Sequence, residues 1–568
     1  MKNTITLTIT LLFSLLLMLS TPTLASESEN KLQIHVHYQQ ASDSWLIQYK
    51  LPKAVERVSF ARQSNFDRTQ HYQITQPDLK WQQEDGVLSI TAANGKKFTS
   101  FSLAFDSFYG FILKDYSQNV QYSDGSVLFY TNHLSLSEKL TAQSEPIFDG
   151  TRFYFYSPKT DIVFSGKRYK HKASWDLAGD GTYIYFGTIT PIENDNMIAV
   201  VDPALPKWVW QNTQTYFPKL FDYYAKKLDQ PLNFKPVVFF NYAHLADDFA
   251  NYEGGTLAGL VQLSVNGKRW QNKDSERFNQ LFHFLAHESA HFWNGQMYAV
   301  EDHGHAWLHE GGADAFANFA MLEFGFIDAK QWLQKFEESA NQCLLNKEQT
   351  ALNESAKLQR YKNYYSCGAV MALASHYQVQ ATNPSLSLFD IWRHLFAQSK
   401  AYSYNQSDYF NVLNGLIGND RLAKALGRFS DQRVEDNLSE IETWFEGTVL
   451  KGAVSTDYPS FYHQHWGKEI IIELMRTHCS RISLSYYDDY IKTYPIENCK
   501  VFDHDMEIQF VDGVDLLKNG GSAYQAFKAK CQRGGVVNFA DRAKQPVAQI
   551  RCLDQVGALT PYIKLTTE

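Results

Sequence analysis

The most restrictive feature of the chain is a pair of histidines, His287 and His291, in a largely apolar segment from Leu281 to Asn294. In a helix, residues four positions apart lie on the same face, one turn from each other. Two imidazoles placed in this way can bind a single Zn²⁺ at about 2.0–2.1 Å. Glu288 follows the first histidine, where it can reach a water beside the ion without binding the ion itself. The segment therefore predicts a helix that carries a hydrolytic zinc site.

A third metal ligand is available at Glu310, after eighteen residues that follow His291. It lies at the start of a second apolar helix, which we expect over Ala313–Phe324, and a short connection can lay that helix across the first. Two histidines and one glutamate leave open the position that a catalytic zinc needs for water. Three other histidines are near in sequence, His283, His303 and His305. Glu310 has the better context as a metal ligand.

Around these residues the sequence resembles the gluzincin metallopeptidases. H-E-x-x-H, eighteen residues and then E is the pattern of the aminopeptidase N-like family, as is Trp-Leu-x-Glu-Gly around Glu310. H-E-x-x-H-x-W-N, from His287 to Asn294, is similar to the glycyl-aminopeptidase family. The resemblance is specific over residues 250–370. It implies one Zn²⁺ held by His287, His291 and Glu310, Glu288 as general base, and a peptide or protein substrate.

The same resemblance suggests two supporting residues. Tyr365-Ser366-Cys367-Gly368 is similar to the Y-x-K-G element, with Cys367 in place of lysine, so Tyr365 would stabilise the tetrahedral oxyanion. Tyr361 and Tyr364 compete for this role, and packing in the core is the alternative. Asp314, four residues after Glu310, matches the E-x-x-x-D pattern and would hold a ligand imidazole by its second nitrogen. A solvent-facing aspartate is the alternative.

The segment Glu253-Gly254-Gly255-Thr256-Leu257 bears on whether the substrate needs a free amino terminus. The related families place a glutamate after such glycines to bind the substrate ammonium, and here Leu257 stands at that position. Gly254 and Gly255 are still expected to contact substrate along an edge strand. Three hypotheses follow: a zinc aminopeptidase, a zinc endopeptidase of the same fold, and an envelope peptide-binding protein with a vestigial site.

The pattern along the chain favours a multidomain protein. Residues 26–205 carry short aromatic and β-branched runs separated by turn signals, which indicates an antiparallel β-sandwich. For 206–454 we expect a helix over Trp208–Leu228 and strands over Val237–Tyr242 and Leu257–Val265. The resemblance implies that this part is a thermolysin-like α+β catalytic domain, mainly helical. Residues 455–568 resemble a PDZ-like α/β domain, with a generic accessory domain as the alternative.

Several features indicate export. Residues 1–25 read as a secretory signal with cleavage after Ala25, an uncleaved anchor being the alternative. No long apolar run follows, so no transmembrane segment is expected in the mature chain, which we place in the periplasm or outside the cell. The net charge of −8 argues against a nucleic-acid partner, and the oligomeric state stays unknown. Six cysteines suggest three disulfides between sequence neighbours, which would join 343 to 367, 479 to 499 and 531 to 552. Free buried thiols are the alternative.

Overall fold

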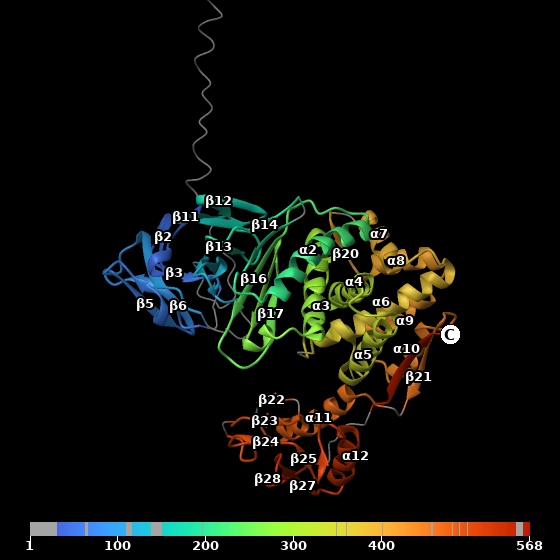
Figure 1. Cartoon of the computed structure of the whole chain (residues 1–568). Coiled ribbons are helices and arrows are strands. Elements are labelled where there is room, and N and C mark those ends of the chain that lie inside the picture. The colour runs from blue at the N-terminus through green and yellow to red at the C-terminus, as the bar shows by residue number, and fades with distance from the viewer. Residues whose placement is uncertain are drawn as a thin grey trace, which may run out of the picture. The chain divides into compact units, whose positions relative to one another are not determined.

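The structure is a computed structural model (Figure 1). It describes residues 31–567 except 63–65, 110–115, 138–149, 196, 348, 359, 400, 456–457, 480, 488, 497 and 553–559. The predicted secretory signal lies outside the described residues. The contacts divide the chain into two compact units. The first comprises the described residues up to Ala225 together with Pro231–Phe292. The second comprises Lys226–Gln230 and the described residues from Trp293 onward.

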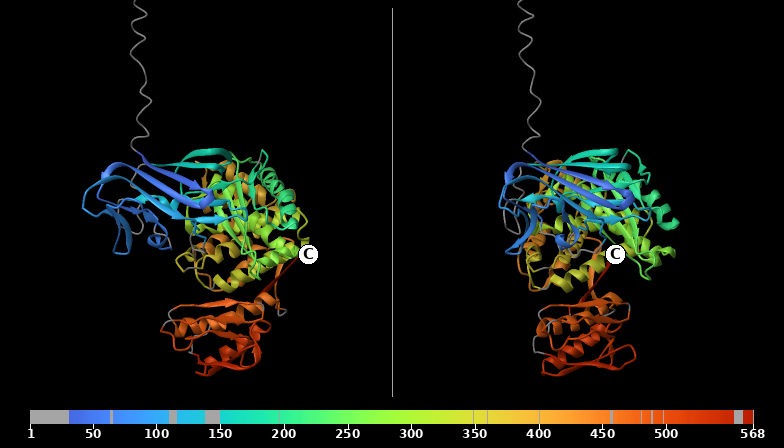
Figure 2. Two further views of the ribbon diagram at one scale, coloured as in Figure 1. Left: turned by 60° about the vertical axis from the view of Figure 1, so that its left-hand side comes forward. Right: turned by 90° about the vertical axis from the view of Figure 1, so that its left-hand side faces the viewer.

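The N-terminal part of the first unit consists of two β-sheets, coloured from blue to teal in Figure 2. The larger sheet has the order β4-β7-β2-β1-β11-β13-β9-β8, with β12 paired to β11, and the smaller has the order β10-β3-β6-β5. The strands are β1 Leu32–Gln39, β2 Ser44–Val55, β3 Arg57–Phe60, β4 Gln73–Ile74, β5 Leu79–Glu84, β6 Val87–Ala92, β7 Phe98–Asp106, β8 Asn119–Gln121, β9 Val127–Tyr130, β10 Leu136–Ser137, β11 Thr151–Phe164, β12 Lys167–Asp176 and β13 Tyr183–Gly187.

Strand β1 shows why these sequences form sheets. Its alternate residues, from Leu32 to Tyr38, are buried, because successive side chains of a strand point to opposite faces. They pack in one core with residues of the smaller sheet such as Val58 and Ile90. The predicted β-rich region is therefore confirmed. One pairing differs from the antiparallel expectation: β1 runs parallel to β11, which a long connection allows.

A five-stranded mixed sheet completes the first unit, in the order β14-β15-β16-β18-β17. Its strands are β14 Ile192–Glu193, β15 Ile198–Val201, β16 Val237–Ala243, β17 Asn251–Leu257 and β18 Leu260–Asn266. The helices of this region are α2 Lys207–Leu228, close to its predicted bounds, and α3 Ser275–His291, which packs against β17 and β18. The single strand expected over Leu257–Val265 is wrong. The chain reverses at Ala258 and Gly259, and the left-handed φ of 73° at Gly259 permits this tight turn between β17 and β18.

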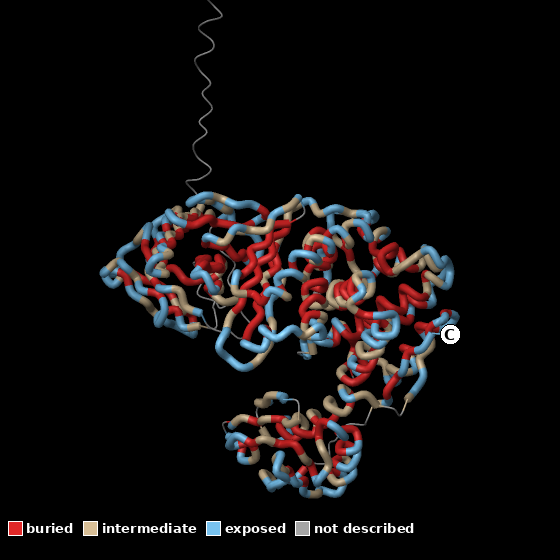
Figure 3. Tube along the Cα trace, in the orientation of Figure 1, coloured by how far each residue is buried: buried red, intermediate tan, exposed pale blue. Residues whose placement is uncertain are grey.

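The second unit begins with a helical part, and Figure 3 shows buried residues inside it. Its helices are α4 Trp307–Glu323, α5 Ala329–Lys347, α6 Lys362–Thr382, α7 Leu388–Gln398, α8 Gln406–Ile417, α9 Arg421–Asp431 and α10 Asn437–Trp444. A β-carbon on Gly311 of α4 would lie 2.3 Å from Gly368 of α6. Two glycines therefore let these helices cross in backbone contact. This unit also contains a short pair of strands, β19 Ala299–Val300 and β20 Ser403–Tyr404.

The C-terminal part holds two small sheets and two helices around one core. Its elements are α11 Ser460–His478, β22 Leu484–Tyr486, β23 Ile491–Thr493, β24 Met506–Ile508, β25 Phe510–Val511, β26 Val514–Asp515, α12 Gly520–Cys531, β27 Val536–Ala540 and β28 Pro546–Arg551. The last strand, β29 Tyr562–Thr567, pairs with β21 Leu450–Ser455. Asn341 on α5 fixes this strand, because its side-chain oxygen accepts from Ile563 N–H at 2.8 Å.

The three predicted disulfides are confirmed. They join Cys343 to Cys367, Cys479 to Cys499 and Cys531 to Cys552. The first links α5 to α6. Among the described residues, no helix combines the length and the apolar character needed to cross a membrane.

Candidate metal centre

Helix α3 carries the two histidines on a well-defined segment. It begins where the side chain of Asp274 accepts a hydrogen bond from Arg277 N–H at 3.0 Å. Near its end, the buried Tyr224 hydroxyl donates to the carbonyl oxygen of Ala286 at 3.0 Å. The chain then continues as a π-helical turn, η4, over Phe292–Met297. His287 is only 6% exposed and His291 is half-buried, so both imidazoles are held at the end of a packed helix.

One group of side chains in the described part of the chain has the composition of a metal site. His287, His291 and Glu310 each offer a ligand atom, and these atoms lie within 4.8 Å of one another. The Nε2 atoms of the two histidines are 3.0 Å apart. Two nitrogens that each lie about 2.0–2.1 Å from one ion can be at most about 4.2 Å apart, so this spacing fits a shared Zn²⁺. The donor set of two imidazoles and one carboxylate also suits that ion.

Glu288, between the two histidines, contacts the edge strand β17. The hydroxyl of Thr256 lies 2.5 Å from Oε2 of Glu288 and 3.0 Å from its backbone carbonyl oxygen. The hydrogen bond holds the carboxylate in one orientation beside the pair of imidazoles. Such orientation is what a general base needs in order to take a proton from a particular water.

Glu310 lies in the first turn of α4, where several contacts define the backbone. The side chain of Asn294, in the turn after α3, donates to the carbonyl oxygen of His309 at 2.9 Å. The backbone carbonyl oxygen of Asn294 accepts from the hydroxyl of Tyr404 at 2.6 Å. Burial, and to a lesser degree the charge of Glu310, raises the pKa of Tyr404 well above its ordinary value, so this phenol stays a donor. His309 Nε2 lies 3.2 Å from Glu310 Oε1.

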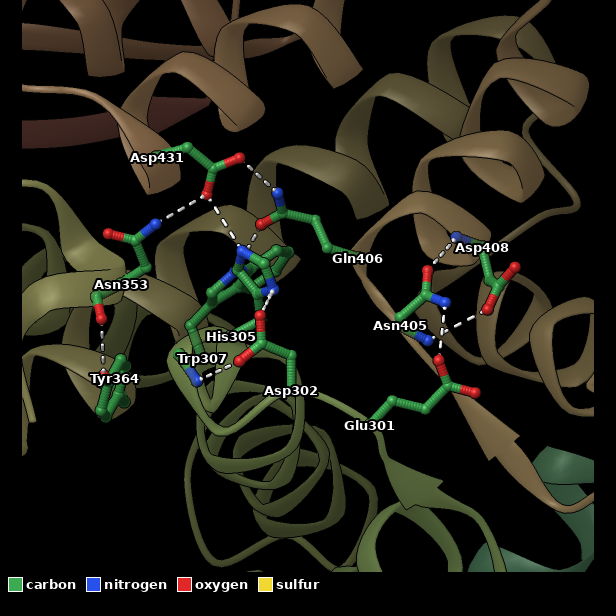
Figure 4. A network of polar contacts seen from close by, with 11 residues as sticks. Glu301, Asp302, His305, Trp307, Asn353, Tyr364, Asn405, Gln406, Asp408 and Asp431 are labelled. Carbon is green, nitrogen blue, oxygen red and sulfur yellow. Dashed lines mark hydrogen bonds and ion pairs between the residues drawn. The ribbon is translucent and has the colours of Figure 1, made fainter.

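A second set of polar contacts, centred on Asp431, holds the start of α4 (Figure 4). Asp431, at the end of α9, is its centre: one carboxylate oxygen is 3.0 Å from His305 Nε2, and the other accepts from Gln406 at 2.8 Å. Gln406 also accepts from the indole N–H of Trp307 at 3.1 Å. Asp302 lies 3.1 Å from the other ring nitrogen of His305. The hydrogen bond with Asp431 therefore holds His305, which lies just before Glu310 in the chain.

The three tyrosines considered for the oxyanion lie in different surroundings at the start of α6. Tyr364 is 3% exposed, and its hydroxyl accepts from Ala356 N–H at 3.2 Å. Burial raises its pKa. Tyr365 is 37% exposed, and Tyr361 is more exposed still. The hydroxyl of Tyr364 is therefore occupied in packing the preceding loop, whereas Tyr365 lies one turn before Gly368, where α6 crosses α4.

The structure places the remaining predicted residues as follows. Asp314 is half-buried on α4, one turn after Glu310, and its hydrogen bond to a ligand imidazole remains a prediction. His283 is half-buried on α3. The side chain of His303 lies outside the described residues.

The strand β17 separates its side chains into two sets. Thr256 faces Glu288, whereas Glu253, Gly255 and Leu257 line a cavity together with the backbone of Gly254. This alternation is expected of a strand. Leu257 is buried in a cluster with Tyr185 and Leu260. The position at which relatives carry a glutamate is therefore apolar, and Glu253 is the carboxylate on that face.

The structure adds residues that the sequence pattern did not identify. Thr256 carries no signal of its own, because its contact with Glu288 depends on the pairing of β17. Asn294 belongs to the H-E-x-x-H-x-W-N segment. Its side chain donates a hydrogen bond to the carbonyl oxygen of His309 and so holds the backbone next to Glu310. Asp431 and Gln406 are more than 90 residues beyond Glu310 in the chain, so no local pattern could have connected them with it.

Comparisons with known proteins give one clear result. No family model matches the chain, and no curated protein matches it by sequence. Among solved structures it is similar to a crystal structure described as an aminopeptidase N family protein from Idiomarina loihiensis, with a TM-score of 0.60 and 12% identity. The match covers 94% of this chain and 98% of that chain. At this identity the likeness concerns the fold, so we conclude that the chain has an aminopeptidase N-like fold.

Proposed function

We propose that the protein is an exported zinc metallopeptidase that acts as an aminopeptidase on peptides in the periplasm or outside the cell. The observation that carries this proposal is the convergence of His287, His291 and Glu310 next to Glu288. The fold and the three disulfides agree with it. A PDZ-like C-terminal domain that adds a peptide strand and delivers it to the site remains part of the proposal.

Each of these side chains would have a defined role in hydrolysis of the peptide bond. Zn²⁺, when bound by the two histidines and Glu310, supplies Lewis acidity that polarises a carbonyl and makes water nucleophilic near neutral pH. Glu288 takes a proton from the attacking water on a carboxylate oxygen and later returns it to the departing amine nitrogen. The Tyr365 hydroxyl donates to the developing oxyanion. Asp314 orients a ligand imidazole through its second nitrogen.

An aminopeptidase must also bind a free α-ammonium, and a cation removed from water needs a carboxylate partner. Since Leu257 is apolar, we assign this role to Glu253, whose Oε1 accepts from Asn266 at 3.3 Å on the cavity side of β17. The absence of a carboxylate at 257 is the observation that favours the second candidate, a zinc endopeptidase of the same fold.

The test compares matched peptides with free and N-acetylated amino termini, incubated with the zinc-loaded full-length chain. An aminopeptidase cleaves only the free set, and Glu253→Gln should reduce that preference at least tenfold. Equal cleavage of both sets, unchanged in Glu253→Gln, supports the endopeptidase. If no peptide is cleaved and Glu288→Gln behaves as the parent does, the site is vestigial and the protein only binds peptides.

A further inference from the structure

A buried disulfide joins two helices of the second unit. Cys343 on α5 is bonded to Cys367 on α6, and both residues are fully buried. The other four cysteines belong to the core of the C-terminal part. The first disulfide is therefore the one that lies in the helical part of the chain, which also carries Glu310.

The residue after Cys367 lies against the backbone of α4. A β-carbon on Gly368 would be 2.5 Å from the carbonyl oxygen of Trp307 and 2.8 Å from the α-carbon of Gly311. Gly311 directly follows Glu310 in the chain. One backbone contact thus connects the disulfide-bonded residue of α6 with the candidate zinc ligand on α4.

The first turns of α4 and α6 carry Glu310 and Tyr365, and neither turn is capped by a side chain. Ala306, which precedes α4, has no polar side-chain atom, and Tyr361, which precedes α6, makes no capping hydrogen bond. The first N–H groups of a helix have no partner within the helix, so a first turn without a cap is less stable. The positions of Glu310 and Tyr365 therefore depend on contacts with neighbouring helices.

Helix α5 provides a fixed point for the disulfide. Two residues before Cys343, the side chain of Asn341 donates to the carbonyl oxygen of Ile563 at 2.7 Å and accepts from Ile563 N–H at 2.8 Å. One turn earlier, Glu337 accepts from Leu565 N–H at 2.8 Å. These hydrogen bonds hold α5 against the strand β29, so a covalent bond from α5 restrains α6 as well.

We propose that Cys343 and Cys367 are positioning residues of the metal site. Their disulfide holds the start of α6 against α4 and thereby keeps Glu310 and Tyr365 in the arrangement that zinc binding and hydrolysis require. The inference rests on the proposed peptidase function and adds a condition to it, because the complete site forms only in a chain that is oxidised at this pair.

Formation of this disulfide is a two-electron exchange with an external disulfide. The thiols of Cys343 and Cys367 lose two protons and two electrons to a small disulfide or a disulfide-exchange protein, which leaves as two thiols. Because both residues are buried in the folded chain, the exchange has to occur before α5 and α6 pack together. Thiols stay reduced in the cytosol and are oxidised outside it. An exported chain would therefore complete its metal site only after export.

The experiment compares two double variants of the full-length chain, Cys343→Ala/Cys367→Ala and the control Cys531→Ala/Cys552→Ala. The control removes a buried disulfide of similar sequence separation, 21 against 24 residues, so a comparable loss of stability is expected. Release of zinc to a chelator is measured well below the Tm of each variant. Release should be at least tenfold faster than in the parent for the first variant and within twofold of the parent for the control.

Steady-state kinetics with zinc in excess provides the second measurement. Cys343→Ala/Cys367→Ala should lower kcat at least tenfold and leave KM within twofold, because the groups that act on the transition state are displaced while substrate binding is retained. The control variant should keep both constants within twofold of the parent. A rise in KM with an unchanged kcat would contradict a role of the disulfide in positioning Tyr365.

Hydrogen exchange of the metal-free chain separates this inference from the proposed function, because it needs neither zinc nor turnover. The N–H of Glu310 bonds to the carbonyl oxygen of Ala306 at 2.9 Å. This amide should exchange at least tenfold faster in Cys343→Ala/Cys367→Ala and at the parent's rate in the control, which supports the inference even if no peptide is cleaved. If zinc release, kcat and exchange are the same in the two double variants, the disulfide stabilises only the fold. The inference is then overturned and the peptidase function stands.

Discussion

The hydroxyl of Thr256 donates a hydrogen bond to the carboxylate of Glu288 at 2.5 Å, and thereby joins the edge strand β17 to the helix that carries the two candidate zinc-binding histidines. The same hydroxyl is 3.0 Å from the backbone carbonyl oxygen of Glu288. A single contact thus relates the strand expected to bind substrate to the residue proposed to move protons. Removing the hydroxyl would free the carboxylate to turn, whereas metal binding would be untouched.

Thr256→Val should lower kcat/KM about tenfold, which corresponds to about 1.4 kcal/mol for the lost hydrogen bond and orientation. Valine keeps the shape of threonine, so the strand itself should be retained. Steady-state kinetics with zinc content measured in parallel provides the test. Thr256→Ser restores the hydroxyl and should recover most of the activity. If Val and Ser variants are equally active, the contact has no role in catalysis.

Tyr365→Phe should reduce kcat by about 10²–10³ while leaving zinc content and Tm close to those of the parent, because only the donor to the oxyanion is lost. Tyr364→Phe is the matched control at the adjacent position. It should lower the free energy of unfolding by about 1 kcal/mol, since the buried hydroxyl holds the preceding loop, and should leave kcat nearly unchanged. A loss of kcat in Tyr364→Phe but not in Tyr365→Phe would transfer the role to Tyr364.

Gly368→Ala should destabilise the protein by about 1–3 kcal/mol, because the new methyl group would lie 2.5 Å from the carbonyl oxygen of Trp307. Denaturant unfolding measures the effect. Gly415→Ala on α8 is the control, since its β-carbon meets nothing within 4 Å. That variant should gain about 0.5–1 kcal/mol from helix propensity. Equal effects of the two substitutions would mean that α4 and α6 are not in backbone contact.

Stability should fall as the solution is made more acidic, in part because of His376. Burial lowers the pKa of His376 to about 4, and its Nδ1 accepts from Leu388 N–H at 3.2 Å, which requires the neutral ring. The unfolded chain binds a proton near pH 6.5. The stabilisation is therefore complete above about pH 6.5 and is lost as pH falls towards 4, by up to about 3 kcal/mol.

His376→Gln should flatten this pH dependence of the free energy of unfolding, because glutamine can accept the same hydrogen bond without titrating. His504→Gln, at a side chain that is 64% exposed, is the control for removing a histidine. Identical pH profiles for parent and His376→Gln would contradict the assignment.

The histidine pair and its helix were predictable because the spacing of four residues is a local relationship that the helix period determines. The sequence-neighbour disulfides were predictable for a similar reason, since short loops close easily. Glu310 required the family resemblance, because it belongs to a different helix and follows His291 only after eighteen residues. The aminopeptidase N-like fold also followed from this resemblance, with only 12% identity to the solved structure.

What could not be predicted depends on contacts between distant residues. The hairpin of β17 and β18 reads as one apolar run until the turn at Gly259 is known. His305 meets Asp431 across 126 positions, and the final strand β29 returns to β21 rather than staying with the C-terminal sheets.

The zinc content of the purified full-length chain, measured by mass spectrometry after free metal has been removed, tests directly whether His287, His291 and Glu310 form a metal site. We expect one zinc per chain in the parent and in Glu288→Gln, with turnover reduced in the latter by a factor of about 10²–10⁴. Glu310→Gln and His291→Leu should each lose most of the metal. This metal site does not exist as described if the parent holds no zinc, if Glu288→Gln loses zinc, or if zinc stays bound after His291 and Glu310 are both replaced.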